Sequence, residues 1–301
     1  MDTAWLADLQ ALAETLNFSR AAERRNITQP AFGRRIKSLE EWCGSVLVDR
    51  STHRLQLTTA GELMLEAAND IHRRLERARR DLDQSRASMS TLTFASTHAL
   101  SFIFFPEWIQ NLGAATSTMP IRLLSDNMKE CEKMMLEGRA QFLLCHHRVG
   151  GRVQLDEREF KYVELATDQL IPVTGKDAGG RALYDLPGSP EAPVPNIAFD
   201  DTSGMGRILS ASLSGRAGEL HLSTVVTSHL AMVLKALAAD GKGIAWIPRS
   251  LALDEIGPNG RLLVAGANEW AVDVKIVLFR QRARMADIAE KFWDLVHKKF
   301  A

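Results

Sequence analysis

Basic side chains crowd one short stretch of this 301-residue sequence, between residues 17 and 37. The six basic residues there are Arg20, Arg24, Arg25, Arg34, Arg35 and Lys37, against the single acid Glu23. Guanidinium and ammonium groups at this density are suited to bind the phosphates of nucleic acid. The whole chain has 37 basic and 37 acidic residues, so a polyanion must be bound by this local cluster and not by net charge.

Catalytic signatures are absent from the sequence, which has no Gly-x-Ser-x-Gly elbow, no Walker phosphate loop and no His-Glu-x-x-His pair. Cys131, Cys145, His146 and His147 could suggest a metal site, but adjacent strand residues such as Cys145 and His146 point to opposite faces. We therefore expect no enzyme activity, no cofactor and no metal.

The composition, 46% hydrophobic and 25% charged, is that of an ordinary globular chain. Cys43, Cys131 and Cys145 follow no regular spacing, which favours reduced thiols and a cytoplasmic protein. The amino terminus lacks the basic residues of a signal peptide. The uncharged run 91–106 is too short and too polar to span a bilayer, so no membrane partner is expected.

Local patterns predict how the basic cluster is positioned. Apolar residues recur at three- and four-residue steps from Trp5 to Leu16, which predicts a helix that ends near Asn17. Ser19 is the predicted N-cap of a second, short helix over residues 20–25, and Thr28 that of a third, with Pro30 in its first turn. Residues 46–58 resemble a strand pair, or wing, that could reach a phosphate backbone.

The third helix should bury Phe32, Ile36 and Leu39, which are spaced i, i+4, i+7. Its opposite, polar face and the wing then meet DNA in the manner of a winged helix-turn-helix, with a helix in the major groove. The alternative is an ordinary solvated helix face. The predicted DNA-binding residues are Ser19, Arg20, Gln29, Pro30, Gly33, Arg34, Arg35, Lys37, Arg50, Thr52 and Arg54.

Residues 17–61 resemble the winged helix-turn-helix of LysR-type transcriptional regulators. The likeness lies in the Phe-Ser opening, the Thr-Gln-Pro-Ala helix start, the Ile-x-x-Leu-Glu finish and the Leu-Thr-x-x-Gly after the wing. Gly33 departs from the pattern, because the family often has Ser there and a hydroxyl contact is lost. The resemblance implies double-stranded promoter DNA as a partner and leaves room for a contact with RNA polymerase.

A long helix should follow from Thr59, where Thr59 and Glu62 fit a capping box. Its apolar seam consists of Leu63, Ala67, Ile71, Leu75, Ala78, Leu82 and Ser85. Such a narrow stripe suits pairing with another helix. The resemblance implies a dimer through this linker helix and commonly a tetramer, and the alternative is packing within the same chain.

From residue 91 onward short apolar strands alternate with helices, which predicts an α/β parallel sheet. Two such sets, with crossovers near 163–167 and 272–274, resemble the two-subdomain, periplasmic-binding-protein-like effector domain of the same family. The expected fold is thus α/β with a mostly helical winged head. The predicted domains are the head 1–58, the linker 59–89 and the effector domain 90–301, with subdomain I at about 90–165 and 273–301 and subdomain II at about 166–272.

Ligands in open α/β sheets bind beyond the carboxyl ends of the strands. The predicted effector residues at such ends are Thr97, His98, Ser101, Asn127, Ser203, Met205, Thr227, Ser228, His229 and Trp246. The Met-Gly-Arg sequence at Met205 resembles the hypochlorite-responsive branch of the family, which is switched by methionine oxidation. His229 departs from that branch, which has a methionine after Ser-Ser, so a switch of several methionines is not supported.

The thioether of Met205 stands between two glycines, which we expect to shield it little, and oxidation would turn an apolar side chain into a polar one. The expected function is therefore a transcriptional regulator that responds to hypochlorous acid or a related oxidant. One alternative is a small anionic or aromatic metabolite held by Thr97, Ser101 and Thr227, with Met205 a core residue. Another is an enzyme or ligand-binding protein fused to a DNA-binding head.

Overall fold

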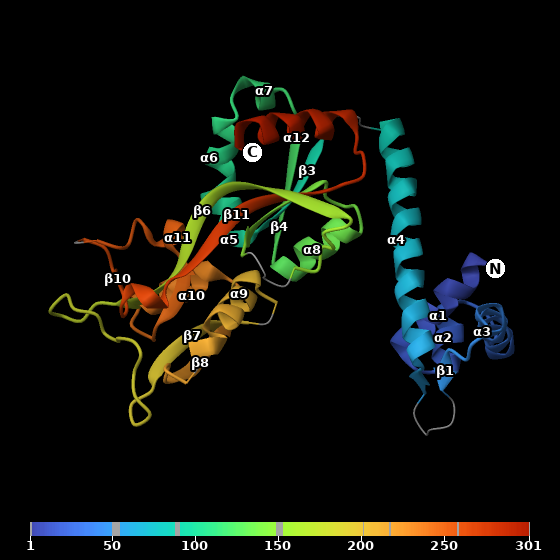
Figure 1. Ribbon diagram of the computed structural model, residues 1–301, viewed down its shortest axis with the longest axis horizontal. Helices are drawn as coiled ribbons and strands as arrows, with labels where there is room; N and C mark the ends of the chain where they lie inside the picture. The colour runs from blue at the N-terminus through green and yellow to red at the C-terminus, as the bar shows by residue number, and fades with distance from the viewer. Residues whose placement is uncertain are drawn as a thin grey trace. The chain divides into compact units, whose positions relative to one another are not determined.

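The computed structural model describes residues 2–49, 55–87, 91–148, 153–200, 202–216, 218–257 and 259–300. It divides into two compact units, Met1–Asp83 and Gln84–Ala301, each of which is described by itself (Figure 1). Arg50, Thr52 and Arg54, predicted in the wing, lie outside the described residues. None of the described helices is long and apolar enough to cross a membrane.

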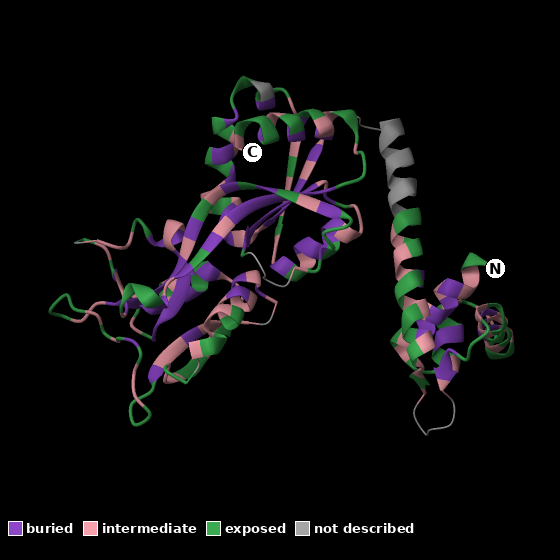
Figure 2. Cartoon of the chain, in the orientation of Figure 1, coloured by how far each residue is buried: buried purple, intermediate pink, exposed green. Residues whose placement is uncertain are grey.

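The first unit is a winged helix-turn-helix followed by one long helix, as predicted. Its elements are α1 (Thr3–Thr15), α2 (Phe18–Arg24), α3 (Gln29–Cys43), the antiparallel strands β1 (Val48–Asp49) and β2 (Gln56–Leu57), and α4 (Thr59–Ala87). Leu9 and Leu12 of α1 pack with Phe32, Ile36 and Leu39 of α3, and all five are fully buried (Figure 2). The predicted core face of the third helix is thereby confirmed.

Two of the predicted helix caps were wrong. The N-cap of α2 is Asn17 and not Ser19, because Asn17 has an extended backbone and its Oδ1 accepts from the N–H groups of Ser19 and Arg20, at 2.9 and 3.0 Å. The cap of α4 is Thr58 and not Thr59, since Thr58 Oγ1 accepts from Gly61 N at 3.0 Å. With Thr58 as cap, the third helical residue is a glycine, so no capping box forms.

Backbone contacts of the wing explain two motif residues. Glu40, the last residue of Ile-x-x-Leu-Glu, accepts through Oε1 from the N–H groups of Leu47 and Val48, at 2.9 and 3.2 Å. Gly61, the last residue of Leu-Thr-x-x-Gly, lies so close to this segment that a Cβ atom there would overlap the Leu47 carbonyl oxygen. The wing is therefore fixed between the end of α3 and the start of α4.

The second unit is built on a seven-stranded sheet in the order β10-β6-β11-β5-β3-β4, with β9 also paired to β6. These strands are β3 (Leu92–Thr97), β4 (Ile121–Asp126), β5 (Phe142–His147), β6 (Phe160–Gly175), β9 (Ala245–Pro248), β10 (Leu262–Val264) and β11 (Val272–Gln281). A separate parallel pair is formed by β7 (Val194–Phe199) and β8 (Leu222–Ser228).

The main sheet is mixed, which corrects the predicted parallel sheet. β3 is parallel to β4 and β5, whereas β11 is antiparallel to both β5 and β6. The cause is the pair of long strands β6 and β11, which contain the two predicted crossovers and return in opposite directions. The helices are α5 (His98–Ile103), α6 (Phe105–Asn111), α7 (Ala114–Ser117), α8 (Met128–Leu136), α9 (Gly204–Leu213), α10 (Ala231–Ala239), α11 (Arg249–Ala252) and α12 (Asp287–Phe300).

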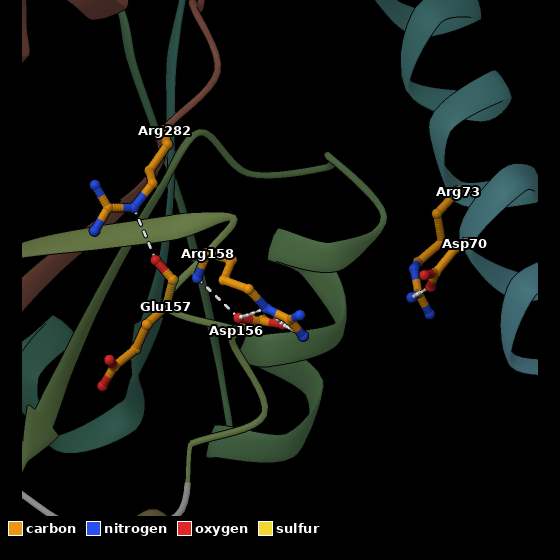
Figure 3. Close-up of polar contacts among 6 residues, drawn as sticks. All are labelled: Asp70, Arg73, Asp156, Glu157, Arg158 and Arg282. Carbon is orange, nitrogen blue, oxygen red and sulfur yellow. Dashed lines mark hydrogen bonds and ion pairs between the residues drawn. The ribbon is translucent and has the colours of Figure 1, made fainter.

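Polar contacts fix the segment that leads into β6 (Figure 3). Asp156 accepts from the backbone N–H of Arg158 at 2.8 Å and pairs with its guanidinium group. Arg282, which follows β11, donates from Nε to the Glu157 carbonyl at 2.8 Å. The same figure shows Asp70 paired with Arg73 one turn later on α4.

The close approach at Gly61 predicts that Gly61→Ala lowers the free energy of unfolding of the head by about 2 to 3 kcal/mol, as is usual for forced overpacking. Amide hydrogen exchange of peptides from α1 and α3 measures this loss separately from the rest of the chain. Gly33→Ala is the matched control, because nothing lies within 4 Å of its Cβ position; alanine there should stabilise α3 by up to about 1 kcal/mol. If α1 and α3 are equally protected from amide hydrogen exchange in the two variants, the close packing of the wing on α4 would be contradicted.

Candidate functional site

The exposed face of α3 carries most of the predicted DNA-binding residues. Gln29, Pro30, Arg34 and Lys37 are exposed, and Gly33 is half-buried between them. Pro30 lies in the first turn of the helix, and Thr28 precedes the helix as its N-cap, without a side-chain bond to the helix backbone. Lys37 makes only a long pair with Glu41, at 3.8 Å, between two exposed side chains. This face is thus polar, basic and accessible.

The amino-terminal end of α2 presents two more of the predicted residues. The side chains of Ser19 and Arg20 are exposed, while their backbone N–H groups are bound by Asn17. A serine hydroxyl and an arginine side chain thus lie on the surface of the head, where they can contact a phosphate.

Arg35 lies apart from its predicted companions. Its Nη1 is 3.5 Å from Oδ2 of Asp8, a fully buried carboxylate of α1. The other oxygen of Asp8 accepts from Nε of Arg25 at 2.6 Å. Asp8 and Arg25 were not among the predicted site residues; the available signal was an acid placed beside Leu9 and Leu12 on an apolar helix face.

The second unit contains a pocket at the carboxyl ends of its strands, where several helices begin. Its lining residues are Thr97, His98, Ala99, Asp126, Asn127, Met128, His146, Ser203, Gly204, Met205, His229 and Ala231. The structure therefore brings together the predicted residues Thr97, His98, Asn127, Ser203, Met205 and His229.

Four other predicted effector residues do not line this pocket. Ser101 Oγ lies behind it, 2.8 Å from Ser125 Oγ. Thr227 is exposed, and Ser228 accepts from the N–H of Leu230 at 3.1 Å. Trp246 lines a different, mainly apolar cavity, and its Nε1 donates to the Trp270 carbonyl at 2.8 Å.

Two polar residues of the pocket are N-caps. Asn127 Oδ1 accepts from Glu130 N at 3.0 Å and caps α8, and Ser203 Oγ accepts from Gly206 N at 3.3 Å and caps α9. Both helices have nine or more residues. Their amino-terminal ends carry partial positive charge toward the pocket, which favours an anion.

Buried polar atoms without a partner also line the pocket. Among the described residues, Thr97 Oγ1 and both ring nitrogens of His146 are buried and make no hydrogen bond. His146 Nε2 is 3.5 Å from Asp168 Oδ2, which is an ion-pair distance. Because an unmet buried donor or acceptor is unfavourable by about 1 to 3 kcal/mol, the pocket is suited to a small polar ligand. The sequence places His146 at the end of a predicted strand, where the effector cleft was expected, as well as in the possible metal group with Cys145.

Two histidines face each other across the pocket, with ring centroids 5.7 Å apart. Burial lowers the pKa of His98; Asp126 opposes this shift, and His229 adds to it. His98 is therefore neutral at pH 7, and its Nδ1 lies 3.0 Å from Ser125 Oγ. His229 Nδ1 lies 3.6 Å from Asp200 Oδ2. Burial raises the pKa of Asp200, but hydrogen bonds from Thr202 and Ser203, together with the nearby His229, outweigh it, so the net pKa is lowered and Asp200 is ionised.

Met205 is buried, with 7% of its surface exposed, in an apolar cluster that also contains Ala99, Ile208 and Trp246. The expectation that its two glycine neighbours leave it unshielded was wrong. A Cβ at Gly204 would lie 3.0 Å from Met128 Cγ, and one at Gly206 would lie 2.9 Å from the Asp200 carbonyl oxygen. The glycines thus allow the first turn of α9 to pack closely.

A buried ion pair continues this contact along α9. Arg207 Nη2 lies 3.0 Å from Oε2 of Glu132, a fully buried residue of α8. The other oxygen, Glu132 Oε1, accepts from Gln154 N at 2.9 Å. Arg148 and Ser212 form a further hydrogen bond between the end of β5 and α9. The helix that carries Met205 is therefore tied to the other half of the domain.

The thiols give no sign of reactivity. Burial raises the pKa of Cys131 to about 12 and that of Cys145 well above its usual value, so both stay protonated at neutral pH. Within the part of the chain that the structure describes, no group of three or more His, Cys, Asp or Glu residues could hold a metal ion.

Comparison with protein families gives two matches that together span nearly the whole chain. Residues 3–62 match the bacterial regulatory helix-turn-helix protein family, lysR family, and residues 85–301 match the LysR substrate binding domain. The first covers the helix-turn-helix and wing, and the second covers the sheet and the pocket.

Individual proteins with the same organisation are similar over their full length. The Escherichia coli (strain K12) HTH-type transcriptional regulator YjiE is 32% identical over 97% of this chain and 93% of its own. The full-length structure of HypT from Salmonella typhimurium, a hypochlorite-specific LysR-type transcriptional regulator, is 29% identical with a TM-score of 0.60, covering 99% of this chain and 98% of the HypT chain. The Vibrio fischeri DarR structure, solved with DNA, is 28% identical with a TM-score of 0.56 and covers 98% of each chain.

Proposed function

The chain belongs to the LysR family of DNA-binding transcriptional regulators, and we propose that it responds to hypochlorous acid or a related oxidant through Met205. The observation that carries this proposal is that Met205 lines the same pocket as Thr97 and His146, whose buried polar side-chain atoms make no hydrogen bond. HypT, the hypochlorite-specific regulator from Salmonella typhimurium, is similar over nearly the full chain. The DNA contacts and the assembly are proposed first, because the response acts through them.

DNA contacts are proposed for the exposed face of α3 and the start of α2. Gln29 and Arg34 would reach base edges or phosphates, and Lys37 and Arg20 would bind phosphates. The wing residues Arg50, Thr52 and Arg54 are proposed backbone contacts on sequence grounds alone. The structure supports these contacts because the side chains of this polar face are exposed to solvent, on the side of α3 away from its buried core residues.

Arg34→Ala should weaken binding to the operator by about 1 to 3 kcal/mol, roughly 5- to 150-fold in Kd. The operator is first obtained by selecting duplexes from a random pool with the wild-type protein, and affinity is then measured by gel-shift titration. Arg158→Ala, an exposed arginine of the second unit, is the control and should leave Kd unchanged. Unchanged affinity in Arg34→Ala would refute the docking.

The linker helix is proposed to pair with the same helix of a second chain, and the dimers to form a tetramer. Leu63, Ile71 and Leu75 of α4 are 65%, 37% and 55% exposed, although all three belong to the predicted apolar seam. Ala67, between them on the seam, is exposed as well. A row of exposed apolar side chains with this spacing is typical of a helix that binds another helix.

Ile71→Glu with Leu75→Glu should halve the mass of the assembly, because two carboxylates would be buried in an apolar seam. Light scattering after size exclusion measures the mass. His72→Glu, an exposed neighbour on the same helix, is the control and should keep the wild-type mass. If the double variant also keeps that mass, α4 is not the dimer contact.

The proposed switch is an oxygen transfer to the Met205 sulfur. The S–O bond forms as the O–Cl bond of hypochlorous acid breaks, and chloride and a proton leave; sulfur loses two electrons and chlorine gains them. The product is methionine sulfoxide, a polar group in a cluster of Ala99, Ile208 and Trp246. Because an unpaired polar group is unfavourable in such surroundings, the first turn of α9 would have to shift.

Met205→Leu should abolish the transcriptional response to hypochlorous acid while leaving DNA affinity unchanged, since leucine keeps the apolar contact and has no sulfur. Met205→Gln, with a polar amide at the same place, should give the response without oxidant. A promoter–reporter strain measures both. Met232→Leu is the control, because Met232 is 43% exposed on α10 and its oxidation should not matter. A normal response in Met205→Leu would contradict the proposal.

A second candidate is a small anionic metabolite as the effector. It is favoured by the amino-terminal ends of α8 and α9 and by the unpartnered atoms of Thr97 and His146. A carboxylate that raises the melting temperature of Met205→Leu as much as that of wild type, and activates the reporter without oxidant, would identify this case. If the carboxylate raises the melting temperature only of wild-type protein that has been oxidised, the result would favour the oxidant as the effector.

A further inference from the structure

One carboxylate joins the three helices of the head. Asp8 of α1 is fully buried, and each of its oxygens faces a different guanidinium group. Arg25, at the end of α2, donates from Nε to Oδ1 at 2.6 Å, and Arg35 of α3 has its Nη1 3.5 Å from Oδ2. The two arginine side chains are 32% and 38% exposed, so both remain partly accessible to solvent while they contact Asp8.

We propose that Asp8 is a positioning residue for DNA recognition. It fixes the angle of α3 relative to α1 and α2, and it holds Arg25 and Arg35 so that they do not act as general phosphate contacts. The predicted DNA-binding role of Arg35 is replaced by this internal one.

The geometry of α3 supports this division between neighbouring arginines. Successive residues of an α-helix are turned by about 100°, so Arg34 and Arg35 cannot face the same way. Arg34 is exposed with Gln29 and Lys37, whereas Arg35 lies toward the side of the buried Ile36 and Leu39. Only Arg34 is therefore oriented with the polar face.

The energetics explain why Asp8 can specify an orientation. The apolar contacts of Phe32, Ile36 and Leu39 hold α3 in place but are not directional. Hydrogen bonds between charged groups are directional and strong, and a buried carboxylate is unfavourable unless it is paired. Any tilt of α3 that separates Arg35 from Asp8 is therefore opposed, which restricts the helix to one orientation.

The same head contains a matched pair with no such role. Glu14 of α1 lies 2.6 Å from Arg24 of α2, but these side chains are 56% and 60% exposed. An exposed pair contributes little. Glu14→Gln and Asp8→Asn change the net charge by the same amount on the same helix, so only burial and geometry distinguish them.

The test compares Asp8→Asn and Glu14→Gln in the full-length protein, on a duplex selected by the wild type and on an unrelated duplex, over a range of salt. In Asp8→Asn the ratio of specific to non-specific affinity should fall at least about tenfold. The plot of log K against log salt for the unrelated duplex should become steeper by about 0.9 for each arginine released. Glu14→Gln should keep the wild-type ratio within about twofold.

The test is completed by two further variants, Arg35→Met, which keeps an apolar stem, and Arg34→Met. If Asp8→Asn does not fold, these two variants alone decide between the outcomes. The salt slope should stay at the wild-type value in Arg35→Met and fall by about 0.9 in Arg34→Met. A lower salt slope in Arg35→Met would overturn the proposal. So would an Asp8→Asn variant that folds and has a lower melting temperature but keeps the wild-type affinity ratio and the wild-type salt slope.

The inference rests on the proposed docking through α3. If Arg34→Met leaves the salt slope unchanged, that docking is wrong, whereas the affinity ratio of Asp8→Asn still tests the role of Asp8.

Discussion

The antiparallel pairing of β6 with β11 is the constraint on which the second unit depends. The register runs from Val272 opposite Leu170 to Gln281 opposite Phe160. One end of this ladder carries β5 and the other carries β9 and β10, so both halves of the domain share the same two strands. A shift in register between Ile276 and Val277 interrupts the ladder, and such irregularities bend strands. A change in the angle between the halves is therefore expected to concentrate there, beside the pocket that both halves line.

Buried polar groups determine which parts of this framework can move. Leaving a buried charge without its partner is strongly unfavourable, by about 3 to 5 kcal/mol. The fully buried Glu132 holds Arg207, two residues after Met205, so α9 cannot leave α8 without breaking that pair. The same principle acts in the head, where Asp8 holds two arginines. In both units a single buried carboxylate thus restrains the helix that carries the proposed functional side chains.

Much of the fold follows from local sequence, and the failures other than the two helix caps share one cause. Periodicity and Pro30 were enough to predict α1, α3 and the 29-residue α4, because these signals act within a few residues. The mixed sheet was missed because the partner of β6 is more than a hundred residues away. Some of the residues that line the pocket were predicted, because they follow the carboxyl ends of predicted strands. The burial of Asp8 and His146 was not predicted, and that of Met205 was predicted only as an alternative, since burial depends on what distant segments place around a residue.

The environment of Met205 bears on how a signal could be stored. A reversible ligand shifts an equilibrium only by its difference in affinity for the two states and only while it is bound. Oxidation of a buried thioether alters the packing itself and persists until the sulfoxide is reduced. Met205 has 7% of its surface exposed and lines the pocket that contains His98, His146 and His229, so the proposed oxidant would reach the sulfur from that pocket. A lasting product suits the proposed response to an oxidant better than the sensing of a fluctuating metabolite.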